Sequence, residues 1–187
     1  MKALILSDGG DASAAADLLL EVLQKRGWEC ETLRLDAMSL RYCSGCFGCW
    51  LRTPGHCAQR DELAAVLKAE VRSDLLACVS PIRWGSYSVE MKKFIERSIP
   101  LLLPFFETFR GEVHHEMRYP RRPIFLAVGI SSGVGEDESV FRELVARNLL
   151  NFRSPSAATV VLDGNRPAEH QDLILKGLKE AGVEGLL

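Results

Sequence analysis

Short apolar segments alternate along the chain with segments in which apolar residues recur every three or four positions. The apolar segments predict strands at residues 3–6, 28–35, 75–79, 124–128 and 157–162. The helical spacing predicts helices near residues 13–25, 61–69, 89–99, 138–150 and 169–181. This alternation is typical of right-handed strand–helix–strand units around a parallel sheet, so the pattern predicts an α/β fold.

The predicted strands differ in their polarity. Residues 28–35 include Glu29, Glu31 and Arg34, whereas a parallel strand inside a sheet is almost continuously apolar. We therefore expect this strand at an edge, and the third, fourth and fifth strands in the interior or close to it. Residues 41–60 and 100–123 fit neither pattern, and we expect long irregular loops there, which in compact domains are usually functional.

Length and composition exclude several classes of protein. With 187 residues, 47% of them hydrophobic, the chain is expected to form one domain over residues 1–187. A net charge of -2 gives no field that would attract nucleic acid. The longest apolar run, residues 99–106, contains two prolines and is too short to cross a membrane. The N-terminus lacks the pattern of a secretory signal, which predicts a cytoplasmic protein.

Six cysteines in a reducing compartment indicate thiols or metal ligands rather than a disulfide framework. Cys30 and Cys78 lie in predicted strands and are interpreted as small buried hydrophobes. The other four form one compact array with two successive C-x2-C steps: Cys43, Cys46, Cys49 and Cys57. Short C-x2-C runs of this kind hold iron-sulfur clusters, while a tetrahedral zinc site and unligated thiols are the alternatives.

In an open parallel sheet, ligands bind beyond the carboxyl ends of the strands, which directs attention to the loops that follow them. Residues 7–13 join the first strand to a helix, and backbone N–H groups there would suit a phosphate, with hydroxyls from Ser7 and Ser13. Asp8 and Asp11 would instead repel a phosphate, and an ordinary strand-to-helix turn is the alternative.

The loop after the third strand, residues 80–88, places an aromatic residue beside a glycine, which suits an isoalloxazine ring. Its sequence Ser-Pro-x-x-Trp-Gly-Ser is followed by a helix with Met91, Lys92, Phe94 and Arg97. This combination resembles the NAD(P)H-dependent FMN reductase and iron-sulfur flavoprotein families. The likeness extends over the first strand and helix, the cysteine segment and the loop 129–136.

The resemblance implies a flavodoxin-like three-layer sandwich, in which a five-stranded parallel sheet of order 2-1-3-4-5 has helices on both faces. It implies FMN as the cofactor, with Ser7 and Ser13 at the phosphate. The flavin ring would be lined on one side by Pro81, Ile82, Arg83, Trp84, Gly85 and Ser86, and on the other by Ser131, Gly133 and Gly135.

The chain departs from these families at two places. Their phosphate loop usually contains an Arg and an Asn-Thr pair, which are absent here, and the residue before the Trp is usually Tyr, whereas here it is Arg83. A guanidinium near the pyrimidine side of the ring would stabilise the reduced flavin anion, and a solvated arginine is the alternative. For Trp84 the alternative is a role as a core anchor.

The sequence contains no Ser-His-Asp signature, no H-E-x-x-H and no Walker-type phosphate loop, so a redox function is the enzyme class that remains. We expect hydride transfer from NAD(P)H through FMN to a quinone-like or other small acceptor, in a homo-oligomer. One alternative is an iron-sulfur flavoprotein that relays electrons between protein partners through FMN and a 4Fe-4S cluster. Another is a flavin-free regulatory or scaffold domain. Residues 114–119 would cap the flavin, contact the nicotinamide dinucleotide, form a dimer surface, or be a solvated loop.

Overall fold

The computed structural model describes residues 1–133 and 137–183. Five parallel strands form the central sheet in the order β2 (Glu29–Arg34), β1 (Lys2–Ser7), β3 (Leu75–Pro81), β6 (Ile124–Ser131) and β7 (Ala157–Asp163). The register pairs Ser7 of β1 with Val79 of β3, and Val79 with Val128 of β6. The carboxyl ends of these three strands therefore meet at one edge of the sheet.

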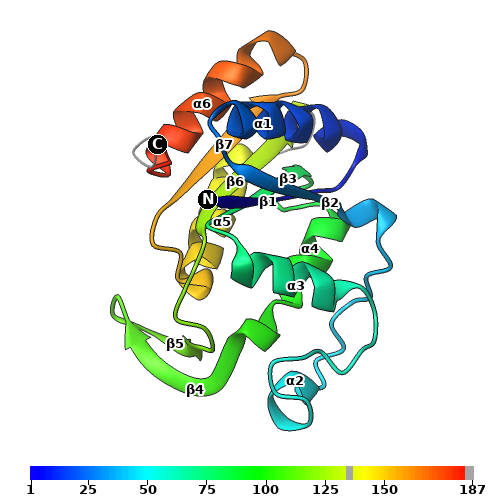
Figure 1. Ribbon diagram of the computed structural model, residues 1–187, viewed down its shortest axis with the longest axis vertical. Helices are drawn as coiled ribbons and strands as arrows, with labels where there is room; N and C mark the ends of the chain where they lie inside the picture. The colour runs from blue at the N-terminus through cyan, green and yellow to red at the C-terminus, as the bar shows by residue number, and fades with distance from the viewer. Residues whose placement is uncertain (134–136, 184–187) are drawn as a thin grey trace.

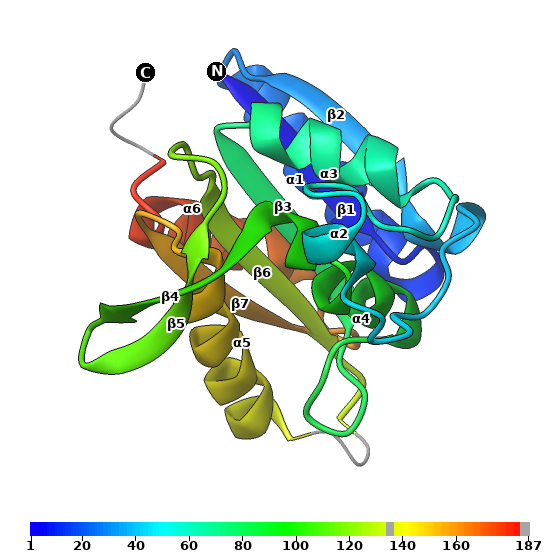
Figure 2. The ribbon, with the colours of Figure 1, turned by 90° about the horizontal axis from the view of Figure 1, so that it is seen from below.

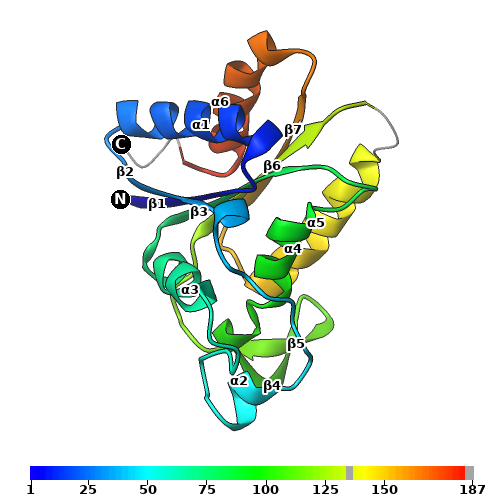
Figure 3. The ribbon, with the colours of Figure 1, turned by 90° about the vertical axis from the view of Figure 1, so that its right-hand side faces the viewer.

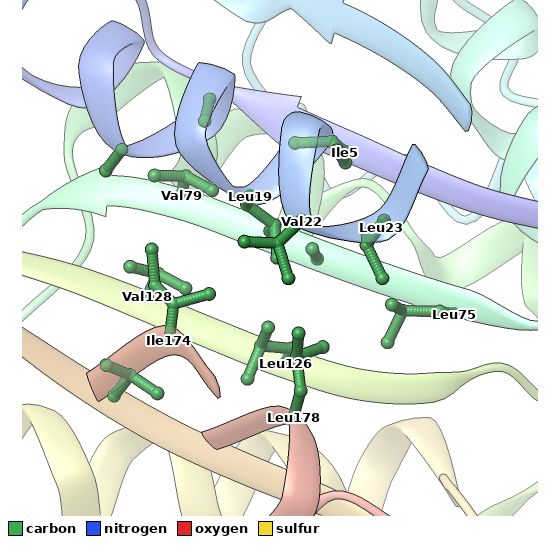
Figure 4. Close-up of a cluster of buried hydrophobic side chains, with 14 of the residues drawn as sticks. Ile5, Leu19, Val22, Leu23, Leu75, Val79, Leu126, Val128, Ile174 and Leu178 are labelled. Atoms are coloured by element: carbon green, nitrogen blue, oxygen red, sulfur yellow. The ribbon is translucent and has the colours of Figure 1, made fainter. Parts of the chain in front are cut away.

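Helices cover both faces of the sheet, which makes three layers (Figures 1 and 3). On one face lie α1 (Ser13–Lys25) and α6 (His170–Glu180), and on the other α3 (Leu63–Arg72), α4 (Val89–Glu96) and α5 (Glu138–Phe152). Figure 4 shows Leu19 of α1 and Ile174 of α6 on the same face of the sheet as Val128, in one hydrophobic cluster. This arrangement buries the apolar stripe of each helix against the sheet, as the helical spacing predicted.

The five predicted sheet strands and the five predicted helices are all present, and the three-layer sandwich is confirmed. The polar strand β2 lies at an edge, as predicted. The fifth sheet strand, β7, forms the opposite edge, where the order 2-1-3-4-5 placed it, although its apolar sequence had suggested a position in the interior or close to it. Alternate residues of β7 are buried, and its partly buried positions, such as Val161, pack on the helical layer of α3, α4 and α5. An edge strand covered on both faces can thus be as apolar as an interior one.

The segment 100–123, expected to be an irregular loop, forms an antiparallel hairpin of β4 (Leu102–Phe109) and β5 (Glu112–Met117), seen in Figure 2. Arg110 and Gly111 make its turn, both with positive φ. Pro104 lies where the register shifts between Leu102 and Phe106, so the proline that argued against a strand occupies an irregular position. The hairpin precedes the last two sheet strands, so the order is 2-1-3-6-7 rather than 2-1-3-4-5.

The cysteine segment, residues 41–60, is mostly irregular and contains the single turn α2 (Gly48–Leu51). Short 3-10 turns at Gly10–Ala12, Leu35–Ala37, Ile99–Leu101 and Pro167–Glu169 complete the regular structure of the described residues. None of the helices in residues 1–133 and 137–183 has the length and apolar character needed to cross a membrane.

Candidate functional site

Two loops at the carboxyl edge, after β1 and after β3, are joined by side-chain contacts although they are far apart in sequence. The Ser88 hydroxyl donates to the Asp8 carboxylate at 2.6 Å. The Arg83 guanidinium donates to the Asp11 carboxylate at 3.4 Å. The first loop and the loop after β3 therefore form one surface, as the sequence predicted from the parallel topology.

The first loop turns sharply before α1 begins. Gly9 and Gly10 have φ of 73° and 49°, and a Cβ on Gly9 would lie 2.3 Å from an Asp36 oxygen. In the described residues α1 has no side-chain cap. The 3-10 turn Gly10–Ala12 leads directly into it, and the amides of Ala12 and Ser13 donate to the carbonyls of Gly9 and Gly10, so the positive end of the helix dipole is what remains to attract an anion. Ser7 is buried at the end of β1 and Ser13 is half-buried as the first residue of α1. Such a helix start fits a single phosphate group.

Trp84 and Gly85 form the tip of a tight turn after β3. The backbones of Arg83 and Ser86 exchange two hydrogen bonds of 2.9 Å around it, and the two tip residues have φ of 49° and 71°. Positive φ at both central positions is the pattern of a type I′ turn and is unusual for a tryptophan. The turn holds Trp84 87% exposed. The interpretation of Trp84 as a core anchor is therefore wrong.

Other residues of this loop have different surroundings. Pro81 and Ile82 are buried. Ile82 packs closely against Gly129, because a Cβ added to Gly129 would lie 2.9 Å from the Ile82 side chain. Gly85 lies against α5, because its Cβ would come within 2.6 Å of Val140. Pro81 and Ile82 thus support the loop from below, while Arg83 and Trp84 are its exposed residues.

Asp8 connects the first loop to α4, whereas the sequence interpretation assigned it only a repulsive effect on phosphate. Burial raises the pKa of its carboxyl, against hydrogen bonds from Ser80 and Ser88 that lower it. Ser88 is also the N-cap of α4, accepting from the Met91 amide, so Asp8 fixes the start of that helix. One carboxylate oxygen of Asp8 is buried and finds no hydrogen-bond partner within the described part of the chain. The sequence signal for this contact was Ser88, because a serine just before a helical pattern indicates a helix N-cap.

The third loop follows β6. Ser131 is buried, and its hydroxyl accepts from the Gly133 amide at 3.3 Å. Gly135 lies outside the described residues, so its predicted contact with the ring stays a prediction. Asp137 caps α5, accepting from the amides of Ser139 and Val140, and these bonds hold the pKa of its carboxyl below the usual value.

The four clustered cysteines line one small cavity of about 40 Å³. Burial raises the pKa of Cys49, and the nearby thiols of Cys57, Cys43 and Cys46 add to that effect. The cavity lies against Arg97, Ile99 and Pro100 after α4. It therefore lies beside the end of α4, and its lining includes no residue of the loops after β1, β3 and β6.

Arg97 is buried and joins the cysteine segment to the start of α3. Its guanidinium donates to the Asp61 carboxylate at 2.5 and 3.0 Å, to the Arg41 carbonyl at 2.9 Å and to the Cys57 sulfur at 3.2 Å. The described residues contain no group of three or more Cys, His, Asp or Glu side chains placed to hold a metal ion. The ligand role of the cysteines stays a prediction.

The histidines of residues 114–119 belong to β5 and are not in a solvated loop. His114 is buried. The ring of His115 lies between those of Trp50 and Phe106, with centroids 4.6 and 4.4 Å away. The hairpin is thereby packed on α2, and these residues have no contact with the loops at the carboxyl edge among the interactions of the described side chains.

Comparison with known proteins identifies the family and the fold of this chain. The model of the family described as NADPH-dependent FMN reductase matches residues 5–162. An iron-sulfur flavoprotein of Methanocaldococcus jannaschii is 30% identical over 151 residues, which are 81% of this chain and 68% of that protein. An iron-sulfur flavoprotein of Archaeoglobus fulgidus is 32% identical over 91 residues, 49% of this chain and 40% of that protein. The chain therefore matches less than half the length of the Archaeoglobus relative.

Solved structures resemble this fold over almost its whole length. The NAD(P)H:quinone oxidoreductase of Methanothermobacter marburgensis has a TM-score of 0.67 at 14% identity, with 97% of each chain covered. An FMN-dependent NADH-azoreductase of Bacillus anthracis, solved in complex with FMN, has a TM-score of 0.63 at 14% identity, with 98% of each chain covered. At these identities the likeness establishes the flavodoxin-like fold and nothing finer.

Proposed function

Because this chain belongs to the NADPH-dependent FMN reductase family, we propose that it binds one FMN at the carboxyl edge of its sheet and reduces a small-molecule acceptor with electrons from NAD(P)H. The observation that carries this proposal is the Trp84 turn. The structure holds a large aromatic side chain 87% exposed, in a backbone conformation unusual for tryptophan, beside a loop suited to one phosphate. Such conformations persist where function requires them.

The residues at the edge fit FMN in charge and in shape. The start of α1, where the helix dipole is positive, binds the phosphate, and Ser7 and Ser13 add hydroxyl donors. Arg83, held against the first loop by Asp11, supplies the cation that the phosphate loop lacks. The exposed indole of Trp84 covers a face of the ring. Bound FMN supplies hydride and single-electron transfer, and the protein supplies binding and orientation.

The acceptor is proposed as a quinone or an azo compound, because similar folds occur in a quinone oxidoreductase and in azoreductases. We infer one domain over residues 1–187 that works in a reducing cytoplasm, since all six cysteines are free thiols.

We also infer a homo-oligomer, because the hairpin exposes Phe105, Phe106 and Val113. Light scattering during size-exclusion chromatography tests the last inference, and a monomer at micromolar concentration contradicts it.

Replacing Trp84 with Ala tests the flavin site. Because the side chain is exposed, the fold should keep its stability, while the affinity for FMN should fall by about tenfold or more. Fluorescence quenching of FMN titrated with protein measures the Kd. Phe105→Ala, which removes an exposed aromatic from the hairpin, is the matched control and should leave the Kd unchanged. Equal losses in both variants would exclude the proposed ring contact.

A second candidate function, electron relay through FMN and a 4Fe-4S cluster, rests on the cysteine cavity. All four cysteines line it, and the buried Arg97 donates to the Cys57 sulfur. The backbone N–H of Gly48, followed by Ser44, lowers the pKa of Cys46, which favours the thiolate that a metal requires. Two successive C-x2-C steps resemble the spacing of iron-sulfur ligands more than the separate pairs of a zinc site, so the spacing favours a cluster over a single zinc ion.

Anaerobic reconstitution with iron and sulfide tests this second function. We expect about four irons per chain in the wild type and a loss of iron in Cys46→Ser, with FMN retained. Cys30→Ser is the control, because Cys30 lies in β2 away from the cavity. Full iron content in Cys46→Ser, or one zinc and no iron in the wild type, would contradict the cluster.

A further inference from the structure

A second cavity, of about 350 Å³, is lined by residues of α4, α5 and the β4–β5 hairpin and by Glu70 near the end of α3. Its walls are largely apolar and include Ile95, Leu144 and Phe152. The Lys92–Glu96 ion pair borders it and is about half exposed, with 45% and 47% of the two side chains accessible, so the cavity reaches solvent there. Its size is that of a small-molecule site.

Four side chains of this cavity carry buried polar atoms with no hydrogen-bond partner among the described residues. They are the Glu70 Oε2, the Tyr87 hydroxyl, the His115 Nδ1, and the Nε and Nη2 of Arg122. The Asn148 side chain lies near the Tyr87 hydroxyl and lowers its pKa, but without the geometry of a hydrogen bond. A group of such atoms around one apolar cavity needs an explanation, because buried polar groups are normally satisfied.

A larger cavity, of about 710 Å³, provides a contrast. It lies between the cysteine segment and α3. Within the described part of the chain, none of its lining side chains has a buried polar atom lacking a partner. A large volume alone therefore does not leave buried polar atoms without partners. The smaller cavity differs from the larger one because several such atoms surround it.

Most of these unsatisfied atoms can donate a hydrogen bond, and the guanidinium of Arg122 places a positive charge in the cavity wall. No carboxylate lies within ion-pairing distance of Arg122 in the described residues. Burial lowers the pKa of Arg122, Glu70 raises it, and the nearby Arg153 lowers it further. Burial raises the pKa of Glu70 to about 8, although Arg122 opposes this. At neutral pH the Glu70 carboxyl is therefore mostly protonated and can donate a hydrogen bond.

We propose that the cavity between α4, α5 and the hairpin binds a small carboxylic acid with an apolar body. The carboxylate pairs with the Arg122 guanidinium and accepts from the Tyr87 hydroxyl, and the apolar body fills the space beside Leu144 and Phe152. A carboxylate matches the cavity because Arg122 offers two unused donors and, among the described residues, has no carboxylate within ion-pairing distance. A cationic ligand would meet Arg122 with repulsion.

Binding of the carboxylate should weaken at alkaline pH, because an ionised Glu70 repels it. The charged and titratable groups around Glu70 and Arg122 are Lys92 and Glu96 of α4, Cys78 of β3, Tyr87, His115 of β5, Tyr119 and Arg153. Lys92 and Glu96 pair with each other at 3.0 Å, so their charges cancel at the border of the cavity. Glu70 is therefore the acid beside Arg122 that loses its proton near pH 8.

Isothermal titration calorimetry of FMN-saturated protein with 2-naphthoate tests the proposal. Saturation with FMN keeps the probe out of the flavin site. We expect a Kd below about 1 mM near pH 6.5, at least tenfold weaker binding near pH 9.5, and at least tenfold weaker binding of the neutral 2-naphthamide. A protein that retains no FMN is titrated without it, so this result does not depend on the proposed function.

Two variants locate the binding. Arg122→Gln should weaken binding of 2-naphthoate at least tenfold, whereas Arg121→Gln, at the exposed neighbour that pairs with Asp74, should leave it unchanged. Tyr87→Phe removes only the hydroxyl and should weaken binding severalfold, which keeps the test decisive if Arg122→Gln unfolds. Equal binding of acid and amide, unchanged binding in both cavity variants, or no binding at about 5 mM would overturn the proposal.

Discussion

Replacing Glu70 with Gln should change how the stability of this protein depends on pH. The side chain is 3% exposed at the end of α3, and burial raises the pKa of its carboxyl from 4.5 to about 8, with Arg122 opposing the shift. Because the folded pKa is above the unfolded one, the protonated carboxyl favours folding at low pH. That contribution is complete below pH 4.5 and is lost as the pH rises through about 8.

The size of the effect follows from the shift. Each pKa unit corresponds to about 1.4 kcal/mol, so the difference between 4.5 and about 8 corresponds to at most about 5 kcal/mol. Relaxation and water entry reduce such penalties in proteins, and we expect a loss of about 3 kcal/mol between pH 5 and pH 9. A domain of this size is stable by about 5 to 15 kcal/mol, so the loss is large enough to measure.

Urea unfolding followed by circular dichroism, repeated across this pH range, gives the free energy of unfolding at each pH. The Gln variant cannot ionise, so its curve should be flatter than that of the wild type by the amount assigned to Glu70. Glu31→Gln, an exposed change in β2, is the control and should run parallel to the wild type. Parallel curves for Glu70→Gln and the wild type would refute the reasoning, whatever their constant offset.

Three further changes test the framework of the site. Gly85→Ala places a Cβ 2.6 Å from Val140 at a residue with positive φ. The free energy of unfolding in urea should fall by about 1 to 3 kcal/mol and FMN should bind more weakly, and a variant with unchanged stability and unchanged FMN affinity contradicts the turn geometry. Ser88→Ala removes the cap of α4 and the donor to Asp8, with an expected loss of about 1 to 3 kcal/mol, and Ser88→Thr should restore most of it. Asp61→Asn leaves its buried arginine partner unneutralised and should lower the urea midpoint by the equivalent of about 3 to 5 kcal/mol, whereas an unchanged midpoint would show that the pair contributes nothing.

The positions of sheet strands and helices were predictable from the sequence, because they depend on local periodicity. Apolar residues in β1 and β3 repeat without interruption, and those of α1 recur at helical spacing. The hairpin was not predicted because prolines and polar residues interrupt the apolar pattern of its strands. Among the described residues its two strands, β4 and β5, pair only with each other, and Pro104 lies at the irregular position of that pairing. The exposure of Trp84 was not determined by its sequence neighbours but by two positive φ angles that the turn imposes.

The sequence by itself determined the layers of this fold, the edge at which its loops meet and the clustering of four cysteines, because each follows from spacing along the chain. The tertiary structure decided which distant groups became partners. Asp8 faces Ser88, and Arg97 joins Asp61 to Cys57, across separations of 36 residues or more. It also decided that Glu70 is buried beside Arg122 without an ion pair, since burial and the resulting pKa depend on which helix covers a side chain rather than on its neighbours in sequence.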